Sequence, residues 1–144
     1  MTQLDDLLKW YSALTPDNVK LAGDFYHPAV HFKDPFNDVQ GVTALIAIFD
    51  HMFATTENPR FIMFDQFGND EQAFVTWTFK FSLKGKPYSV QGSTHFKMDP
   101  SGLIIEHRDY WDAAEELFQQ LPLIGGPIRW LRRQFKVNTT PSGH

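Results

Sequence analysis

The hydrophobic pattern of the chain changes its period near Pro59, and this change limits the folds open to it. Before Pro59, apolar residues recur at helical spacing, as in the set Leu4, Leu7, Leu8, Tyr11 and Leu14. After it, apolar and polar residues alternate over four segments, residues 60–67, 73–83, 88–98 and 103–111. Short runs rich in Gly, Asn, Asp and Pro separate these segments, as in antiparallel hairpins. The pattern predicts an α+β domain in which helices precede an antiparallel sheet.

Three further helical segments and one short strand complete the expected order of elements. Thr15 can cap a second helix that begins at Pro16, with the stripe Val19, Ala22, Phe25 and Tyr26. A short strand over residues 29–34 ends at Pro35, and a third helix follows Gly41. After Asp112 the pattern predicts a helical extension, including a basic amphipathic stretch over residues 128–136. We expect one domain over residues 1–136 and a flexible tail over 137–144.

Alternation sorts the strand residues onto two faces before any function is considered. The inward set of the long strand contains Val75, Trp77, Phe79, Phe81 and Leu83, and the next strand contributes Val90, Gly92, Thr94, Phe96 and Met98. In the last strand, Leu103, Ile105, His107, Asp109 and Trp111 share one face. A histidine and an aspartate are thus predicted on a mostly apolar surface. Asp34 shares a face with Val30 and Phe32 in the same way.

The composition narrows the classes of partner and chemistry. The 144 residues include 14 Phe and 4 Trp, enough aromatic area to fill a core or line a cavity. The absence of Cys excludes thiol nucleophiles, disulfides and thiolate metal sites. A formal charge of -4 disfavours nucleic acid as the main partner. The acidic start lacks a signal-peptide pattern, so we expect a cytoplasmic protein.

Two carboxylates on apolar faces are the strongest functional signal, because burial raises the pKa of a carboxyl group toward values useful to a general base. Each candidate also has a structural alternative. Asp34 precedes Pro35 and could accept turn hydrogen bonds, and Asp109 could pair with a neighbouring Arg or cap a helix. His107 could be a satisfied buried imidazole, and Tyr11 could be core filler.

The stretch from Phe25 to Pro35, followed by Gly41, resembles the first half of steroid Δ-isomerase-like and polyketide cyclase-like proteins. Residues 108–112 resemble the last-strand motif of SnoaL-like and limonene epoxide hydrolase-like proteins. The chain is therefore similar to the nuclear transport factor 2-like superfamily. The resemblance implies a cone-shaped, curved antiparallel sheet that N-terminal helices wrap around an apolar pocket.

The resemblance also implies roles for single residues. Asp34 matches the general base of the steroid isomerases, and Tyr11 lies near their oxyanion-stabilising tyrosine. Thr94 takes the place of their protonated aspartic acid, as a weaker donor. Trp77 and Phe79 occupy the positions of the Arg and Asp that epoxide hydrolases use to activate water, so that chemistry is disfavoured.

We therefore expect a pocket enzyme that moves protons on a small, apolar carbonyl compound without metal or cofactor. The candidate catalytic residues are Asp34, Asp109, His107 and Tyr11, and which carboxylate is the base stays open. The candidate substrate-binding residues are Thr94, Trp77, Phe96, Phe32 and Trp111. A binding module without chemistry is the alternative, and a membrane-surface or protein-docking role for the last helix is the third. We also expect a homodimer through the outer face of the sheet, around Phe74, Thr76, Thr78, Ser93 and His95.

Overall fold

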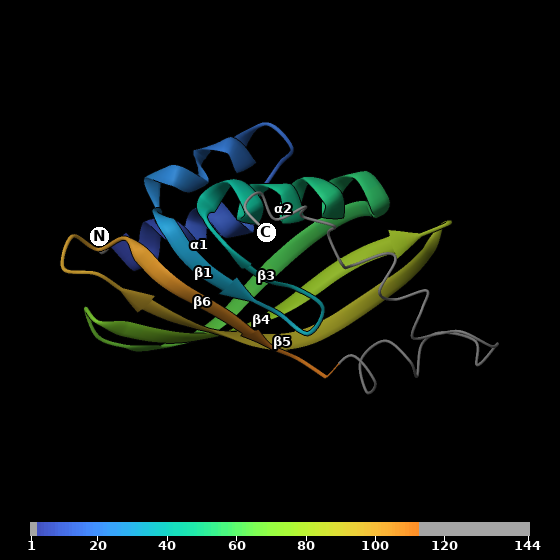
Figure 1. Cartoon of the computed structure of the whole chain (residues 1–144). Coiled ribbons are helices and arrows are strands. Elements are labelled where there is room, and N and C mark those ends of the chain that lie inside the picture. The colour runs from blue at the N-terminus through green and yellow to red at the C-terminus, as the bar shows by residue number, and fades with distance from the viewer. Residues whose placement is uncertain (1–2, 113–144) are drawn as a thin grey trace.

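The computed structural model describes residues 3–112, which form helices packed on one face of a six-stranded sheet (Figure 1). The elements are α1 (Gln3–Ser12), η1 (Asn18–Asp24), β1 (Tyr26–Lys33), β2 (Asp38–Gln40), α2 (Val42–Thr55), β3 (Glu57–Gly68), β4 (Gln72–Leu83), β5 (Lys86–Met98) and β6 (Ile104–Tyr110). Helices come first and long strands afterwards, as the change of period predicts. The expected C-terminal helices, the end of the domain at 136 and the tail lie outside the described residues.

The sheet is curved, and its strand order is β2-β1-β6-β5-β4-β3. The four long strands form the predicted antiparallel meander, and β1 pairs with β2 antiparallel. However, β1 pairs with β6 in parallel, so the sheet is mixed rather than wholly antiparallel. The direction of β1 depends on how the helical segment before it crosses the sheet, which strand periodicity does not encode.

The second helix differs from the prediction, because it is a 3₁₀ helix of seven residues and ends at Asp24. Its buried residues, Val19 and Ala22, are three apart, which matches the three residues per turn of a 3₁₀ helix. The predicted start at Pro16 with Thr15 as the cap is wrong, because the helix begins at Asn18 and its N-cap is Asp17; the Thr15 hydroxyl instead accepts the Asn18 amide at 3.0 Å in the preceding turn. Tyr26 is not on this helix but begins β1.

The predicted inward face of the sheet is confirmed for β4 and β5. Its buried side chains include Val75, Trp77, Phe79, Phe81, Val90, Thr94 and Phe96. In β6 the prediction for Ile105 is wrong, because that side chain is 40% exposed whereas Ile104 is buried. The β5–β6 pairing shifts register between Lys97 and Met98, and such a bulge moves the alternation by one residue. His107 lies beyond the shift and is buried, as predicted.

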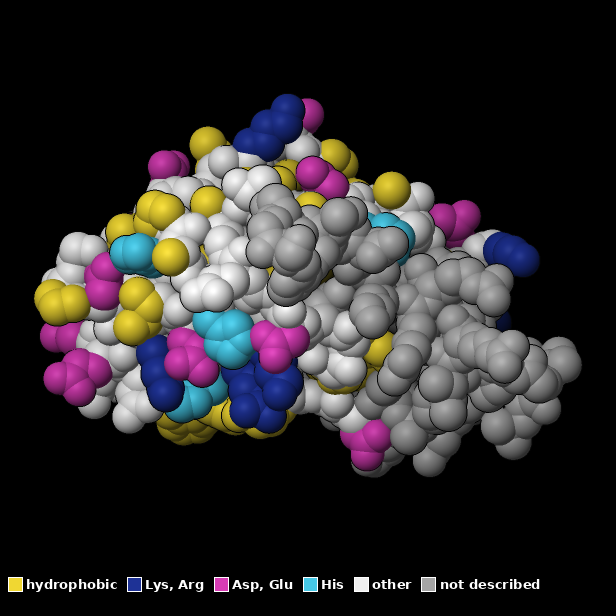
Figure 2. Space-filling view, viewed as in Figure 1, with side chains coloured by type: hydrophobic (Ala, Val, Ile, Leu, Met, Phe, Trp, Pro, Cys, Tyr) yellow, Lys and Arg dark blue, Asp and Glu magenta, His cyan; other side chains and the backbone are white. Residues whose placement is uncertain are grey.

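The outer face of the sheet carries exposed apolar side chains. They include Ile62, Phe67, Phe74 and Tyr110. Hydrophobic side chains are visible along the lower edge of the molecule in Figure 2. Phe67 pairs with Phe74 across β3 and β4, and the rings of Phe74 and Tyr110 are 6.5 Å apart. No helix within residues 3–112 is long and apolar enough to cross a membrane.

Candidate functional site

Six side chains on the inward face form one continuous hydrogen-bonded chain. They come from α1, β1 and three neighbouring strands of the meander, and in order they are Tyr11, Tyr26, His107, Asp109, Thr94 and Trp77. Strand register explains much of the arrangement, because Thr94 is paired directly with Asp109 across β5 and β6. Side chains of such a pair lie on the same face, within contact distance.

Asp109 is the centre of this chain. Its Oδ1 accepts hydrogen bonds from the Thr94 hydroxyl at 2.5 Å and from His107 Nε2 at 2.7 Å. The Thr94 oxygen in turn accepts a bond from the Trp77 indole N–H at 2.8 Å. Gly92 makes the indole position possible, since a Cβ at Gly92 would lie 2.5 Å from the Trp77 ring. Asp109 Oδ2 receives no hydrogen bond from residues 3–112, so it keeps its capacity to accept one.

The other ring nitrogen of His107 connects to two buried phenols. Tyr26 Oη lies 2.8 Å from His107 Nδ1, and Tyr11 Oη lies 2.8 Å from Tyr26 Oη. A neutral His107 with its proton on Nε2 lets Tyr11 donate to Tyr26, Tyr26 to Nδ1 and Nε2 to Asp109. A protonated ring would reverse the first two bonds and leave the Tyr11 proton with no acceptor among the described residues. Hydrogen-bond counting therefore favours the neutral ring with Nε2 protonated.

Both phenols stay protonated at ordinary pH. Burial raises the pKa of Tyr11 well above 10.0, and the adjacent Tyr26 and the charge of Asp109 raise it further. Burial raises the pKa of Tyr26 likewise, against the lowering effect of its hydrogen bond with Tyr11. An un-ionised phenol is a hydrogen-bond donor, so the chain holds His107 in a single tautomer.

Asp34 lies at the end of β1 and combines a turn with a pocket position. Its Oδ1 accepts hydrogen bonds from the backbone amides of Phe36 at 2.8 Å and Asn37 at 2.6 Å, which is the turn role that the sequence left open. Burial nevertheless raises the pKa of Asp34 from 3.8 to about 6, and the negative charge of Asp109 adds to the rise. The hydrogen bonds from Phe36 and Asn37 act in the opposite direction but do not cancel it.

The predicted site residues face two adjoining cavities rather than one. The larger, of about 80 Å³, is lined by the predicted residues Phe32, Asp34, Trp77, Asp109 and Trp111. The smaller, of about 20 Å³, is lined by Tyr11, Trp77, Thr94, Phe96, His107 and Asp109. Asp109 and Trp77 line both, so the two carboxylates lie on the same side of the sheet, as the parity argument requires.

Thr94 and Tyr11 were expected to donate hydrogen bonds to a substrate, but both hydroxyls are already used inside the protein. The single Thr94 proton is donated to Asp109, and the Tyr11 proton is used by Tyr26 in the favoured arrangement. Neither hydroxyl can donate to a bound ligand until these bonds rearrange. Their roles as donors to a substrate therefore stay predictions.

Tyr26 is the residue of this network that the sequence pattern did not single out. It falls on the predicted helical stripe, because His27 and Pro28 suggest a helix end. Tyr26 is buried like Val30 and Phe32, but Pro28 between them is exposed and the pairing of β1 with β6 shifts register between Tyr26 and His31, so strand parity alone does not identify it. A strand that starts three residues earlier than predicted places Tyr26 on the inward face.

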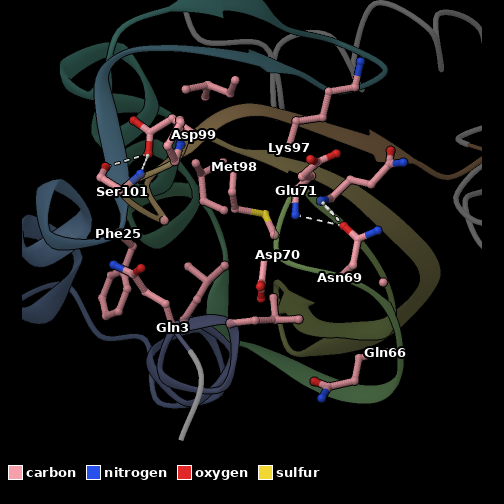
Figure 3. A pocket seen from close by; sticks show the side chains of 18 of the residues that line it. Gln3, Phe25, Gln66, Asn69, Asp70, Glu71, Lys97, Met98, Asp99 and Ser101 are labelled. Carbon is pink, nitrogen blue, oxygen red and sulfur yellow. Dashed lines mark hydrogen bonds between the residues drawn. The ribbon is translucent and has the colours of Figure 1, made fainter.

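A much larger hollow, of about 1050 Å³, lies at the end of the molecule where α1 begins (Figure 3). The turns β3–β4 and β5–β6 surround it, and none of the predicted site residues lines it. Two of its polar side chains, Asn69 and Asp99, are occupied by hydrogen bonds within the turns. Asn69 Oδ1 accepts the Glu71 and Gln72 amides, and Asp99 Oδ1 accepts the Ser101 amide and hydroxyl. We therefore place the candidate site in the smaller, aromatic cavities.

The described residues provide no set of side chains that could bind a metal ion. Among residues 3–112, no group of three or more His, Asp or Glu side chains is placed to hold a metal ion. His107 Nε2 and Asp109 Oδ1 are bonded to each other.

The sequence matches the SnoaL-like domain family over residues 7–107, a span that includes both tyrosines, Asp34, Thr94 and His107. The chain belongs to this SnoaL-like family. Asp109 lies just beyond the matched span. A search of curated proteins gave no significant match.

Solved structures of the same fold are similar over most of the chain. A protein with a ketosteroid isomerase-like fold from Catenulispora acidiphila, in complex with trimethylamine, has 18% identity and a TM-score of 0.70, covering 81% of this chain and 92% of that one. A putative SnoaL-like polyketide cyclase from Jannaschia has 13% identity and a TM-score of 0.67, with 78% and 87% covered. An LEH-like epoxide hydrolase of M. tuberculosis has 13% identity and a TM-score of 0.69, with 83% and 88% covered. At these identities the likeness shows the fold alone.

Proposed function

We propose that this SnoaL-like protein is a pocket enzyme that transfers a proton between carbons of a small, largely apolar carbonyl compound. The observation that carries the proposal is the pair Asp34 and Asp109, which line one cavity with aromatic walls. Burial raises the pKa of Asp34 to about 6 and makes it a stronger base than an aspartate in water, because desolvation favours the neutral acid. The mechanism needs no metal or redox cofactor.

Asp34 is the better candidate for the base. A carboxyl group with a pKa of about 6 is mostly ionised at neutral pH, and it binds a proton more readily than an ordinary aspartate. In the proposed step, a carboxylate oxygen of Asp34 takes the proton from the carbon beside the carbonyl. The electrons of the broken C–H bond move to the carbonyl oxygen and form an enolate. Asp34 then returns the proton to a second carbon, which completes an isomerisation.

Asp109 and His107 form the second part of the proposed site. His107 orients the Asp109 carboxylate through Oδ1, and Oδ2 would accept a hydrogen bond from the ligand. The Tyr26 hydroxyl fixes the His107 tautomer from the other side. In this proposal His107 and Tyr26 are positioning residues, since the contacts that involve them are with Asp109 and Tyr11 rather than with the larger cavity.

Hydrogen–deuterium exchange tests the proposed reaction even while the substrate is unidentified. A panel of small ketones and enones is incubated in D₂O with the protein, and NMR follows the loss of signal beside the carbonyl. We expect exchange with wild type, a large loss with Asp34→Asn, and no loss with Asp50→Asn, which removes an exposed carboxylate from α2. Equal exchange by wild type and Asp34→Asn would contradict the assignment of the base.

The second candidate function is a binding module without chemistry, and one observation favours it. The hydroxyl protons that would stabilise an enolate, those of Thr94 and Tyr11, are already donated inside the protein. Such a module would bind ligands from the panel without exchanging their protons. Ligand affinity that survives Asp34→Asn while exchange is lost would instead identify the enzyme.

The relatives support a small ligand and leave its identity open. One is in complex with trimethylamine, another is described as a polyketide cyclase and a third as an epoxide hydrolase. The expected homodimer through the outer face gains support from the exposed rings of Phe67, Phe74 and Tyr110. The dimer and the cytoplasmic location are predictions.

A further inference from the structure

The larger cavity has walls made mostly of aromatic rings. Eight of its fourteen lining residues are Phe or Trp, namely Phe32, Phe36, Phe49, Phe61, Trp77, Phe79, Phe81 and Trp111. Several neighbouring rings meet at steep angles, as the sides of a box do. Phe61 and Trp77 are 5.6 Å apart at 86°, and Phe36 and Trp111 are 5.6 Å apart at 63°. Other lining rings are stacked, as Phe61 and Phe79 are at 4.7 Å and 26°, so the rings around the cavity differ in orientation.

The same cavity is lined by two carboxylates, Asp34 and Asp109, and none of its described lining residues is Lys or Arg. His51 is its one other titratable lining residue among those described. Hydrogen bonds from Phe36 and Asn37 to Asp34, and from Thr94 and His107 to Asp109, compensate for part of the cost of burying these groups. A cationic ligand would add the charge compensation that neutral donors do not supply.

We infer that the ligand of this cavity carries a compact organic cation, a methylated or otherwise alkylated ammonium group. The electron-rich faces of aromatic rings attract such a group, and its methyl groups fit apolar walls. The carboxylates add direct charge attraction, which is strong where water is excluded. The inference rests on the proposed function in placing the ligand in this cavity, and it adds the charge of the ligand.

The size of the cavity suits a head group of this kind. Its volume of about 80 Å³ compares with the ~10–15 Å³ that one water molecule needs on the same measure, which leaves room for roughly five to eight such groups. Choline, with seven non-hydrogen atoms, falls within this range. Its neutral analogue 3,3-dimethyl-1-butanol has the same shape but carbon in place of nitrogen. The two compounds separate charge from shape.

The interaction between a cationic ligand and the carboxylates should also make the affinity for the ligand depend on pH. A cation stabilises ionised Asp34, so cation binding and proton release from Asp34 are linked. Asp109 and His51 also face the cavity and contribute to the same pH dependence. Affinity for the cation should rise as the pH rises through about 6, the pKa of Asp34, whereas affinity for the neutral analogue should not.

The experiment is a calorimetric titration of the full chain with choline and with 3,3-dimethyl-1-butanol at pH 5 and pH 8. We expect choline to bind about tenfold or more tightly than the alcohol at pH 8, since a desolvated cation over aromatic faces gains about that factor. The ratio should fall at pH 5. Equal affinities, or tighter binding of the alcohol, would overturn the inference.

Variants locate the binding site. Trp111→Leu and Phe36→Leu each remove one ring and keep an apolar side chain, so each should weaken choline binding more than alcohol binding. Asp50→Asn should leave both unchanged. Thermal melting shows whether each variant is folded. If one of the two ring variants does not fold, the other one still tests the inference. NMR shifts induced by choline only outside the cavity would also overturn the inference.

The outcome is separable from that of the proton-transfer proposal. Exchange of neutral ketones in D₂O together with no preference for choline would leave the enzyme proposal standing and refute the cationic ligand. Choline binding at the cavity without exchange on any ketone would support the cation site and favour the binding module.

Discussion

Replacement of Asp34 by Asn should make the protein more stable at pH 8. The folded chain raises the pKa of Asp34 from 3.8 to about 6, mainly through burial. The difference is roughly 2 pK units, and at about 1.36 kcal/mol per unit it corresponds to ~3 kcal/mol. Because folded Asp34 binds its proton more tightly than unfolded Asp34, the stabilising contribution is fully present below about pH 3.8. It is lost as the pH rises through about 6, and the ionised Asp34 carboxylate then destabilises the folded state.

An asparagine avoids this loss but weakens the turn. Its side-chain oxygen can still accept the backbone amides of Phe36 and Asn37, which now bond to Asp34 Oδ1. It is a poorer acceptor for the side-chain amide of Asn37, because Nδ2 of Asn37 now donates to both carboxylate oxygens of Asp34 at 3.2 Å and an asparagine has only one such oxygen. The weakened bonds cost about 1 kcal/mol. The expected net gain is therefore ~2 kcal/mol at pH 8, changing to a small loss near pH 4.

Urea unfolding followed by tryptophan fluorescence at pH 4, 5, 6, 7 and 8 measures this effect. Wild type should lose stability relative to Asp34→Asn as the pH rises, with most of the change between about pH 4 and pH 6 and little above it. Asp50→Asn should track wild type throughout, because Asp50 is exposed. A variant that is equally or less stable than wild type at pH 8 would refute the reasoning. It would show that the turn bonds to the carboxylate outweigh its burial, and that Asp34 is a structural residue.

Three further predictions concern the network, the cavity wall and the outer face. Tyr26→Phe leaves His107 Nδ1 without its 2.8 Å partner, so we expect a loss of about 1–3 kcal/mol in urea unfolding and altered ¹⁵N shifts of the ring in NMR. Unchanged ¹⁵N shifts of the His107 ring would contradict the inference that Tyr26 fixes its tautomer. Gly92→Ala places a methyl group 2.5 Å from the Trp77 ring and should cost about 1–3 kcal/mol with a shifted fluorescence maximum, whereas unchanged fluorescence would contradict it. Phe74→Lys should convert the expected homodimer to monomer in sedimentation, and a monomeric wild type at micromolar concentration would count against the dimer.

The faces of the strands were predictable from the sequence because alternation is a local property of the backbone. Thr94, His107 and Asp109 were placed on the inward face by parity, and the structure confirms their positions. The same argument failed at Ile105, where the bulge beside Met98 shifts the register of β6. A bulge depends on the partner strand, so one strand's alternation does not contain it.

The α+β class, most of the order of elements and the turns of the meander followed from the sequence alone, since period and turn chemistry act over a few residues. The three-residue strand β2 was not predicted. The tertiary structure decided the parallel pairing of β1 with β6, the hydrogen bond between Tyr26 and His107, and the raised pKa of Asp34. Tyr26 and His107 are 81 residues apart, and Asp34 owes its pKa to burial and to the charge of Asp109 on another strand. Such properties arise from which segments meet and how completely water is excluded between them, and these exist only once the chain has folded.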